Sequence, residues 1–325
     1  MWIVLESMLV QQAHTTLNPA SPQVRLVDRL GNTMFVTAAL VCLLVFGTLL
    51  WAAFRRRNTA EPLVDARRER PMKSVVLLAT GVTTAILFVF LIFDFSVGRT
   101  ITTNPGNRAL QIRVTGHQWW WEVQYRDSLP QNGVTTANEI HIPVGRPVVF
   151  ELRSTDVIHS FWPPNLSPKR DQIPGDENSL WFQADRPGVY RGVCAEFCGH
   201  QHAKMGFLVV AEPPGEFTGW LARQRDTATT PTDSLAQRGR EVFLASSCVM
   251  CHAISGTPAG SRIGPDLTHL ASRRTLAAGT LPNTRGYLTA WIVDPQAIKP
   301  GVKMPPNQLS GPDLVALVAY LETLK

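Results

Sequence analysis

Two long apolar stretches dominate the hydropathy pattern of the first hundred residues. Between Arg29 and Arg55 there are 25 uncharged residues, and between Lys73 and Asp94 there are 20. A helix needs about 20 apolar residues to cross roughly 30 Å of hydrocarbon. A buried hairpin of a soluble protein is the alternative, but soluble helices of this length usually keep a polar face. We therefore predict two transmembrane helices, over about residues 32–54 and 74–95.

The pattern after the second apolar stretch consists of short segments rich in Val, Ile, Trp and Phe, which Gly and Pro interrupt. Several such strands within about 100 residues predict an antiparallel sandwich. The expected strands are residues 110–115, 119–125, 139–142, 148–153, 180–183, 188–192 and 207–210. A short helix over residues 215–225 and a polar linker over residues 226–234 are expected to follow.

The last ninety residues have helical periodicity. Gly239 and Phe243 are expected to face a set of apolar residues in the last helix, namely Leu317, Tyr320 and Leu321. The predicted organisation is therefore an N-terminal segment with the hairpin, a sandwich domain, a linker and a small helical domain. Their predicted bounds are residues 1–98, 99–212, 213–234 and 235–325.

The net charge of +6 reflects mainly the predicted membrane topology of the chain. Nine of the 31 basic residues lie in the first 73 positions, and most of these fall between the two predicted helices. The positive-inside rule therefore places residues 55–73 in the cytoplasm and the later domains outside. Residues 235–325 carry nine basic and five acidic side chains, which suits either electrostatic docking or a generic solvated surface. We expect no nucleic-acid binding.

Potential metal ligands are densest between Cys194 and Met205. Thiolate, thioether and imidazole ligands favour copper over magnesium or calcium. A lone Cys-x3-Cys pair also suits a disulfide, a redox pair or half of a zinc site, but none of these explains His202 or Met205. His159 lies where another strand could supply a second imidazole. The set exceeds the needs of one copper ion and suits two ions bridged by Cys194 and Cys198.

This pattern resembles the dinuclear copper A domain of subunit II of haem-copper cytochrome c oxidases, whose motif is Cys-x-Glu-x-Cys-x3-His-x2-Met. Every position of the motif is matched here. The resemblance implies a cupredoxin-like sandwich that binds two copper ions through His159, Cys194, Cys198, His202, Met205 and the backbone carbonyl of Glu196. It also implies that the Glu196 carboxylate reaches a magnesium ion shared with subunit I. A simple solvated carboxylate is the alternative.

Three consecutive tryptophans occupy positions 119–121, after Gly116, His117 and Gln118. The run resembles the Gly-x-Gln-Trp-aromatic-Trp segment of the same subunit, which implies that electrons enter the copper site at Trp119. Packing in the core or at the membrane surface is the expected role of Trp120 or Trp121.

A second cofactor motif is Cys248-Val-Met-Cys251-His252, the pattern of covalent haem c attachment. A zinc knuckle is the alternative, but no second Cys or His pair follows at zinc-finger spacing. Met304, which lies 52 residues after His252, is the expected second axial ligand of the iron. Met250 lies inside the attachment turn, and His269 is expected at the surface.

The segment Ile263-Gly-Pro265-Asp-Leu267 resembles the part of cytochrome c in which a proline carbonyl supports the proximal histidine. The two cofactor motifs use four of the five cysteines, and Cys42 lies in an apolar stretch. We therefore expect no structural disulfide, and an inert Cys42.

The resemblance extends over the whole chain and implies a multi-domain membrane protein. Its parts are a two-helix transmembrane hairpin, an all-β cupredoxin-like Greek-key sandwich and an all-α cytochrome c domain, as in subunit II of caa3-type oxidases. The implied cofactors are two copper ions, one haem c and a magnesium ion. The implied location is the bacterial inner membrane, with both metal domains on the periplasmic face.

The resemblance also implies the partners and the direction of electron flow. Electrons pass from a periplasmic cytochrome c or a quinol-oxidising complex through haem c and copper A to haem a of subunit I. Other oxidase subunits and membrane lipid are the remaining partners, and oxygen is reduced by the proton-pumping complex. Two alternatives stay open: the small subunit of a copper-A-containing nitric oxide reductase, and a membrane-tethered electron shuttle without a catalytic partner.

Overall fold

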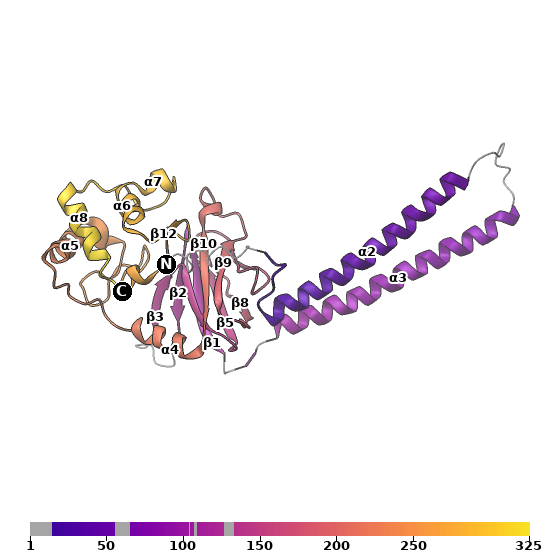
Figure 1. The fold of residues 1–325 in the computed structure, drawn as a ribbon, viewed down its shortest axis with the longest axis horizontal. Coiled ribbons are helices and arrows are strands. Elements are labelled where there is room, and N and C mark those ends of the chain that lie inside the picture. Colours follow the sequence, from indigo (N-terminus) through magenta and orange to yellow (C-terminus); the bar gives the residue numbers. More distant parts are fainter. Residues whose placement is uncertain (1–14, 56–65, 104, 107–108, 127–132) are drawn as a thin grey trace, which may run out of the picture. The chain divides into compact units, whose positions relative to one another are not determined.

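The structure is a computed structural model that describes residues 15–55, 66–103, 105–106, 109–126 and 133–325. The chain divides into two compact units. One is a pair of long helices within residues 25–103, and the other holds the β-sheets and the short helices (Figure 1).

The long helices are α2, Pro22–Arg55, and α3, Ala66–Thr102. Both contain a window of mean hydropathy above 2 in which no residue is buried. Hydroxyl groups within them bond to carbonyls one turn earlier, as Thr37 does to Thr33 and Thr84 to Thr80. Such internal pairing is what lipid requires of polar groups. The two predicted transmembrane helices are confirmed and are longer than expected, while residues 56–65 of the intervening loop lie outside the described residues.

The sandwich consists of two five-stranded sheets. The first has the order β3-β2-β1-β5-β8, formed by β1 Leu110–His117, β2 Trp120–Tyr125, β3 Val134–Ala137, β5 Val148–Ser154 and β8 Asn178–Phe182. The second has the order β4-β10-β9-β6-β7, formed by β4 Glu139–Pro143, β6 His159–Trp162, β7 Arg170–Gln172, β9 Gly188–Cys194 and β10 Gly206–Glu212. All seven predicted strands are present.

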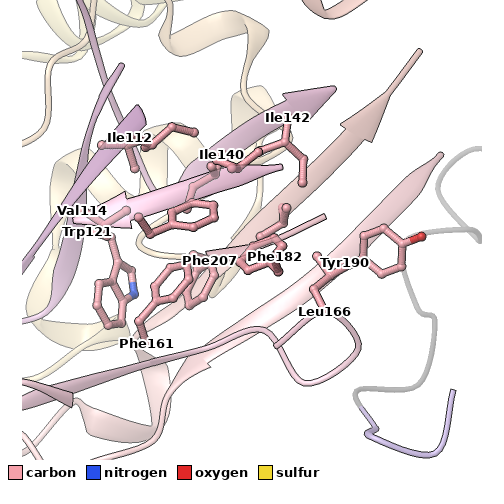
Figure 2. Packing of buried hydrophobic residues seen from close by; sticks show 14 of the residues in the cluster. Ile112, Val114, Trp121, Ile140, Ile142, Phe161, Leu166, Phe182, Tyr190 and Phe207 are labelled. Atoms are coloured by element: carbon pink, nitrogen blue, oxygen red, sulfur yellow. The ribbon is translucent and has the colours of Figure 1, made fainter. Parts of the chain in front are cut away.

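Aromatic rings from both sheets fill the space between them, as Figure 2 shows. Trp121 of β2 meets Phe207 of β10 edge to face, with ring centroids 5.4 Å apart. Phe161 of β6 stacks on Phe207 at 4.3 Å. All three are fully buried. Burying a side chain of this size contributes roughly 1.5–3 kcal/mol, so this core fixes the strands that carry the site.

The sequence-based prediction of a purely antiparallel sandwich is wrong at two pairs. β1 pairs with β5, and β10 with β4, in parallel. Both pairs join strands that are distant in sequence, so alternation within one strand could not reveal them. His159 begins β6, so a strand supplies this imidazole.

The helical domain comprises α5 Ser234–Ala245, α6 Arg285–Val293, α7 Pro295–Ile298, α8 Gly311–Leu321 and a small hairpin of β11 Thr275–Leu276 and β12 Leu281–Pro282. Helices α5 and α8 cross so closely that a Cβ on Gly239 would lie 1.9 Å from the Ala316 oxygen. The rings of Phe243 and Tyr320 are 6.2 Å apart. The predicted contact between the first and last helices is confirmed.

Helix α4, Pro214–Arg223, falls inside the predicted linker, close to the expected helix. Its Phe217 and Trp220 are buried in the core cluster of the sandwich, and Trp220 stacks on His141 at 4.1 Å. Helix α4 therefore packs as part of the sandwich. The domain boundaries predicted from the sequence stay a prediction.

Candidate metal and haem sites

Two free thiols form the centre of the first site. Cys194 ends β9, and Cys198 follows in the loop before β10. Their sulfur atoms lie 3.7 Å apart and both side chains are buried. A disulfide requires about 2.05 Å between sulfur atoms, so this pair is not bonded. The gap is of a size that shared metal ions can fill.

The other predicted ligands surround these two sulfur atoms in two groups. His159 Nδ1 is 3.9 Å from Cys194 Sγ, and the Glu196 carbonyl oxygen lies 3.2 Å from the same sulfur atom. On the other side, Cys198 Sγ lies 3.7 Å from both His202 Nδ1 and Met205 Sδ. The structure thus brings all six predicted ligand residues together around the thiol pair.

Each thiol changes the proton affinity of the other. Their mutual hydrogen bond lowers the pKa of Cys194 to about 3, with His159 acting in the same direction against the effect of burial. The same contact and burial raise the pKa of Cys198 well above its ordinary value. The two buried sulfur atoms share one proton. A soft cation can replace that proton, because metal ions bind thiolates. The donor set therefore fits copper.

Asp156 orients one of the imidazoles. Its Oδ1 lies 2.9 Å from His159 Nε2, while Oδ2 accepts from the Gln118 backbone N–H at 2.7 Å. Because Asp156 binds Nε2, the Nδ1 lone pair of His159 faces the thiols. Metal-binding histidines usually have such a hydrogen bond on the ring nitrogen that does not face the metal. Sequence analysis missed Asp156, although its i,i+3 spacing from His159 was a signal.

The Trp119 ring joins the thiol loop to its surroundings. Its indole Nε1 donates to the Cys198 carbonyl at 2.9 Å, and the Gln118 amide donates to the same oxygen at 2.8 Å. Gly199 has φ +111°, and a Cβ there would lie 3.0 Å from Trp119 Cζ2. Glycine therefore lets the indole approach the loop. Trp121 lies in the core, and Trp120 stacks on His117 at 4.4 Å.

The second site is a cavity of about 460 Å³ whose walls come from both the sandwich and the helical domain. The helical domain contributes the predicted haem residues Cys248, Cys251, His252 and Met304. The sandwich contributes His117, Gln118, Trp119 and Trp120. The Trp119 side chain therefore lies between the two sites.

His252 is held in the state that iron ligation requires. Its Nδ1 lies 2.7 Å from the Pro265 carbonyl, which confirms the predicted support and leaves Nε2 as the free ring nitrogen. Burial lowers the pKa of His252, so the imidazole stays neutral. A neutral, oriented imidazole in a cavity that also contains two free thiols and a thioether fits covalent haem c.

His269 was expected at the surface, and this prediction is wrong. The side chain is buried, and its Nδ1 lies 2.8 Å from the Lys325 carbonyl at the C-terminus. Met250 is exposed in the attachment turn.

Comparison with known proteins agrees with both sites. The chain matches the family model described as "Cytochrome C oxidase subunit II, periplasmic domain" over residues 130–212, and the cytochrome c model over residues 236–325. Cytochrome c oxidase subunit 2 of Alkalihalophilus pseudofirmus is 35% identical over 332 residues, which cover 99% of this chain and 94% of the relative. This chain belongs to the cytochrome c oxidase subunit II family.

Other members of the family are also similar to this subunit II chain. The subunit 2 of Bacillus sp. (strain PS3) is 31% identical and covers 84% of this chain and 80% of the relative. The periplasmic domain of subunit II from Bradyrhizobium japonicum is 30% identical, covers 37% of this chain and 96% of that structure, and superposes with a TM-score of 0.35. The chain is thus a membrane-anchored electron-transfer subunit of an oxidoreductase complex, with a copper A domain and a haem-binding cytochrome c domain.

Proposed function

We propose that this subunit II chain accepts electrons in its helical domain from a periplasmic donor and delivers them through its sandwich to haem a of subunit I. The donor is a periplasmic cytochrome c or a quinol-oxidising complex. The bound copper and haem supply one-electron redox chemistry, and the protein supplies their ligands and the path between them. The observation that carries the proposal is the position of Trp119, which lines the cavity and donates to the Cys198 carbonyl.

The ligand set supports two copper ions in the sandwich. Cys194, Cys198, His159, His202, Met205 and the Glu196 carbonyl would hold the copper. In the helical domain, Cys248 and Cys251 would attach the haem, and His252 and Met304 would hold its iron. The Glu196 carboxylate would hold a magnesium ion shared with subunit I, as the resemblance implies.

The sandwich keeps its ligands in place mechanically. His159 is held by Asp156 at 2.9 Å and packs on the buried Trp121 ring, with centroids 5.9 Å apart. Ligands held by a close-packed sheet move little when the charge of the site changes. Small rearrangement favours electron transfer over bond-making chemistry, as expected for a relay that does not itself reduce oxygen.

The charge pattern supports a location in the bacterial inner membrane, with the sandwich and helical domain in the periplasm and residues 55–73 in the cytoplasm. A reporter that is active only in the periplasm is expected to work when fused after Lys325 and to be silent when inserted within residues 58–66. The reverse pattern would contradict the charge argument.

Metal content and electron spin resonance of the purified complex test the proposal. We expect two copper ions and one covalent haem c per chain, with the hyperfine pattern of one electron shared by two copper nuclei. The complex should consume oxygen and co-purify with a large haem-containing subunit. A single-copper pattern, haem extracted by acidic acetone, or nitric oxide as the only substrate would refute it.

A further inference from the structure

The turn between β11 and β12 has an unusual backbone where the helical domain meets the sandwich. Ala277 and Ala278 have φ of 52° and 57°, and Gly279 has 72°. Left-handed backbone is disfavoured for alanine because of its Cβ. Two consecutive alanines in this region need partners that hold them there.

The partners bond to the carbonyls of these alanines. The backbone N–H of Gly206, at the start of β10 in the sandwich, donates to the Ala278 carbonyl at 2.9 Å. Lys299 Nζ donates to the Ala277 carbonyl at 3.1 Å. Lys299 follows α7 and belongs to the helical domain.

Lys299 reaches the sandwich at the residue that connects the two sites. Its Nζ also donates to the backbone carbonyl of Trp119, at 3.1 Å. The lysine is only 1% exposed. Among the described residues no carboxylate lies within ion-pair distance of it, which is rare for a buried lysine. Such a group is costly to bury and therefore points to a role beyond filling space.

The two carbonyls provide acceptors for the Lys299 amine. Burial, together with the neighbouring Lys204, lowers the pKa of Lys299 to about 7. A neutral amine has two N–H groups, and the Trp119 and Ala277 carbonyls accept one each. The contact therefore does not depend on a charged partner.

The residues after Lys299 also contact the sandwich, close to the Trp119 side chain. The Pro300 carbonyl accepts from Gln201 at 2.6 Å, and Val302 packs against the sandwich core. A Cβ on Gly301 would lie 3.9 Å from Trp119 Cη2. Residues 299–302 thus cover the Trp119 indole and lead directly to Met304.

We propose that Lys299 is a positioning residue that latches the helical domain onto the Trp119 edge of the sandwich. It fixes the Trp119 backbone and the left-handed turn at once, so that the Met304 loop keeps one separation from the indole. This inference rests on the proposed route past Trp119. Without the amine, the Trp119 carbonyl loses its Lys299 donor, and the Ala277 carbonyl keeps only the Thr280 hydroxyl, which donates to it at 2.7 Å.

The test compares Lys299→Met with Lys303→Met in the purified complex. Methionine keeps much of the side-chain length and cannot donate. Lys303 lies on the same loop but is 66% exposed, with only a 3.8 Å ion pair to Asp156. Such exposed pairs contribute little. Amide hydrogen exchange of peptides covering Gly206 and the 275–282 hairpin reports docking without any turnover.

We expect exchange at these peptides to be at least about tenfold faster in Lys299→Met, because the interface opens locally. Flash-initiated transfer from haem c to copper should slow at least about tenfold, with both spectra and the haem c potential unchanged. A role in haem binding alone would shift that potential. Lys303→Met should match the wild type in hydrogen exchange at these peptides.

Wild-type exchange and transfer in Lys299→Met would overturn the latch. If that variant does not assemble, Lys299→Leu, which also lacks a donor, replaces it, and wild-type values there would equally overturn the latch. Failure of the wild-type complex to pass electrons from haem c to copper would overturn the proposed route as well. If the wild type passes electrons from haem c to copper and both lysine variants do so at the same rate, the latch is refuted and the proposed route is not.

Discussion

The two cofactor sites differ in how much of each a single domain supplies. In the sandwich, six ligand residues lie around two sulfur atoms 3.7 Å apart, held by one close-packed core. In the helical domain the ligands line a cavity of about 460 Å³, and part of its wall is the tryptophan edge of the sandwich. The copper site is therefore preorganised by its own fold. The haem site depends on how two domains meet.

The largest effect expected from this difference is the loss of one centre without the other. Cys198→Ser removes a sulfur atom that contacts Cys194, His202 and Met205. We expect nearly complete loss of bound copper and of its absorption, with the haem c spectrum retained. Metal analysis of the purified complex measures this.

Cys42→Ser is the matched control, because Cys42 is an exposed free cysteine of α2 that belongs to neither motif. Loss of haem c in Cys198→Ser would show that the two sites are not built independently.

Trp119→Gln tests the wall that both sites share. The indole donates to the Cys198 carbonyl and lines the cavity, so its removal should slow haem-to-copper transfer at least about tenfold, a barrier change of about 1.4 kcal/mol. Both metal spectra and the copper-to-haem a step should change little. Flash-initiated kinetics resolve the two steps.

Trp120→Gln sharpens this test, because Trp120 lines the same cavity but stacks on His117 away from the thiols. A larger slowing in Trp120→Gln than in Trp119→Gln would move the path to the neighbouring ring.

Met304→Ala tests the part of the haem site that the helical domain supplies. A thioether raises the potential of haem iron, so the variant should have a lower potential and lose the weak ferric sulfur-to-iron band at the red end of the visible spectrum. The haem should stay attached through Cys248 and Cys251. Redox titration and absorption measure both effects.

Met250→Ala is the control for a methionine in the same domain, because Met250 is exposed in the attachment turn. An unchanged band in Met304→Ala would mean that another residue is the second ligand of the iron.

The smallest effect concerns the pH dependence of stability. Burial lowers the pKa of His141, but bonds to Glu139 and Glu212 outweigh it and leave the pKa raised. A raised pKa stabilises the fold fully below the unfolded value of about 6.5 and loses this contribution as pH rises through the folded value. The unfolding temperature of the sandwich should therefore fall as pH rises through that range.

His141→Gln should flatten this dependence, since Glu139, Glu212, Tyr125 and the Trp220 ring would then face a group that does not titrate. A wild-type slope in His141→Gln would assign the pH dependence to other residues.

How well the sequence predicted the site depends on how far apart its residues lie along the chain. Cys194, Cys198, His202 and Met205 lie within twelve positions, so their order alone indicated a common site. The α5–α8 contact followed from helical periodicity. The short strands β3, β6 and β7 lacked a long enough alternation to be found.

Contacts between distant segments were the ones that could not be predicted. His269 is buried because a carbonyl 56 residues later accepts from it, and Lys299 because its acceptor at Trp119 is 180 residues away. Nothing in the local pattern around either residue distinguishes it from a surface residue. Both contacts became visible only in the folded structure, the first within the helical domain and the second between the two domains.

The most direct test of the account is the order of reduction in the wild-type complex after haem c is reduced by a flash. We predict that the copper absorption changes in step with re-oxidation of haem c and before haem a is reduced. Reduction of haem a without a preceding change at copper, or copper reduced while haem c stays reduced, would contradict the relay.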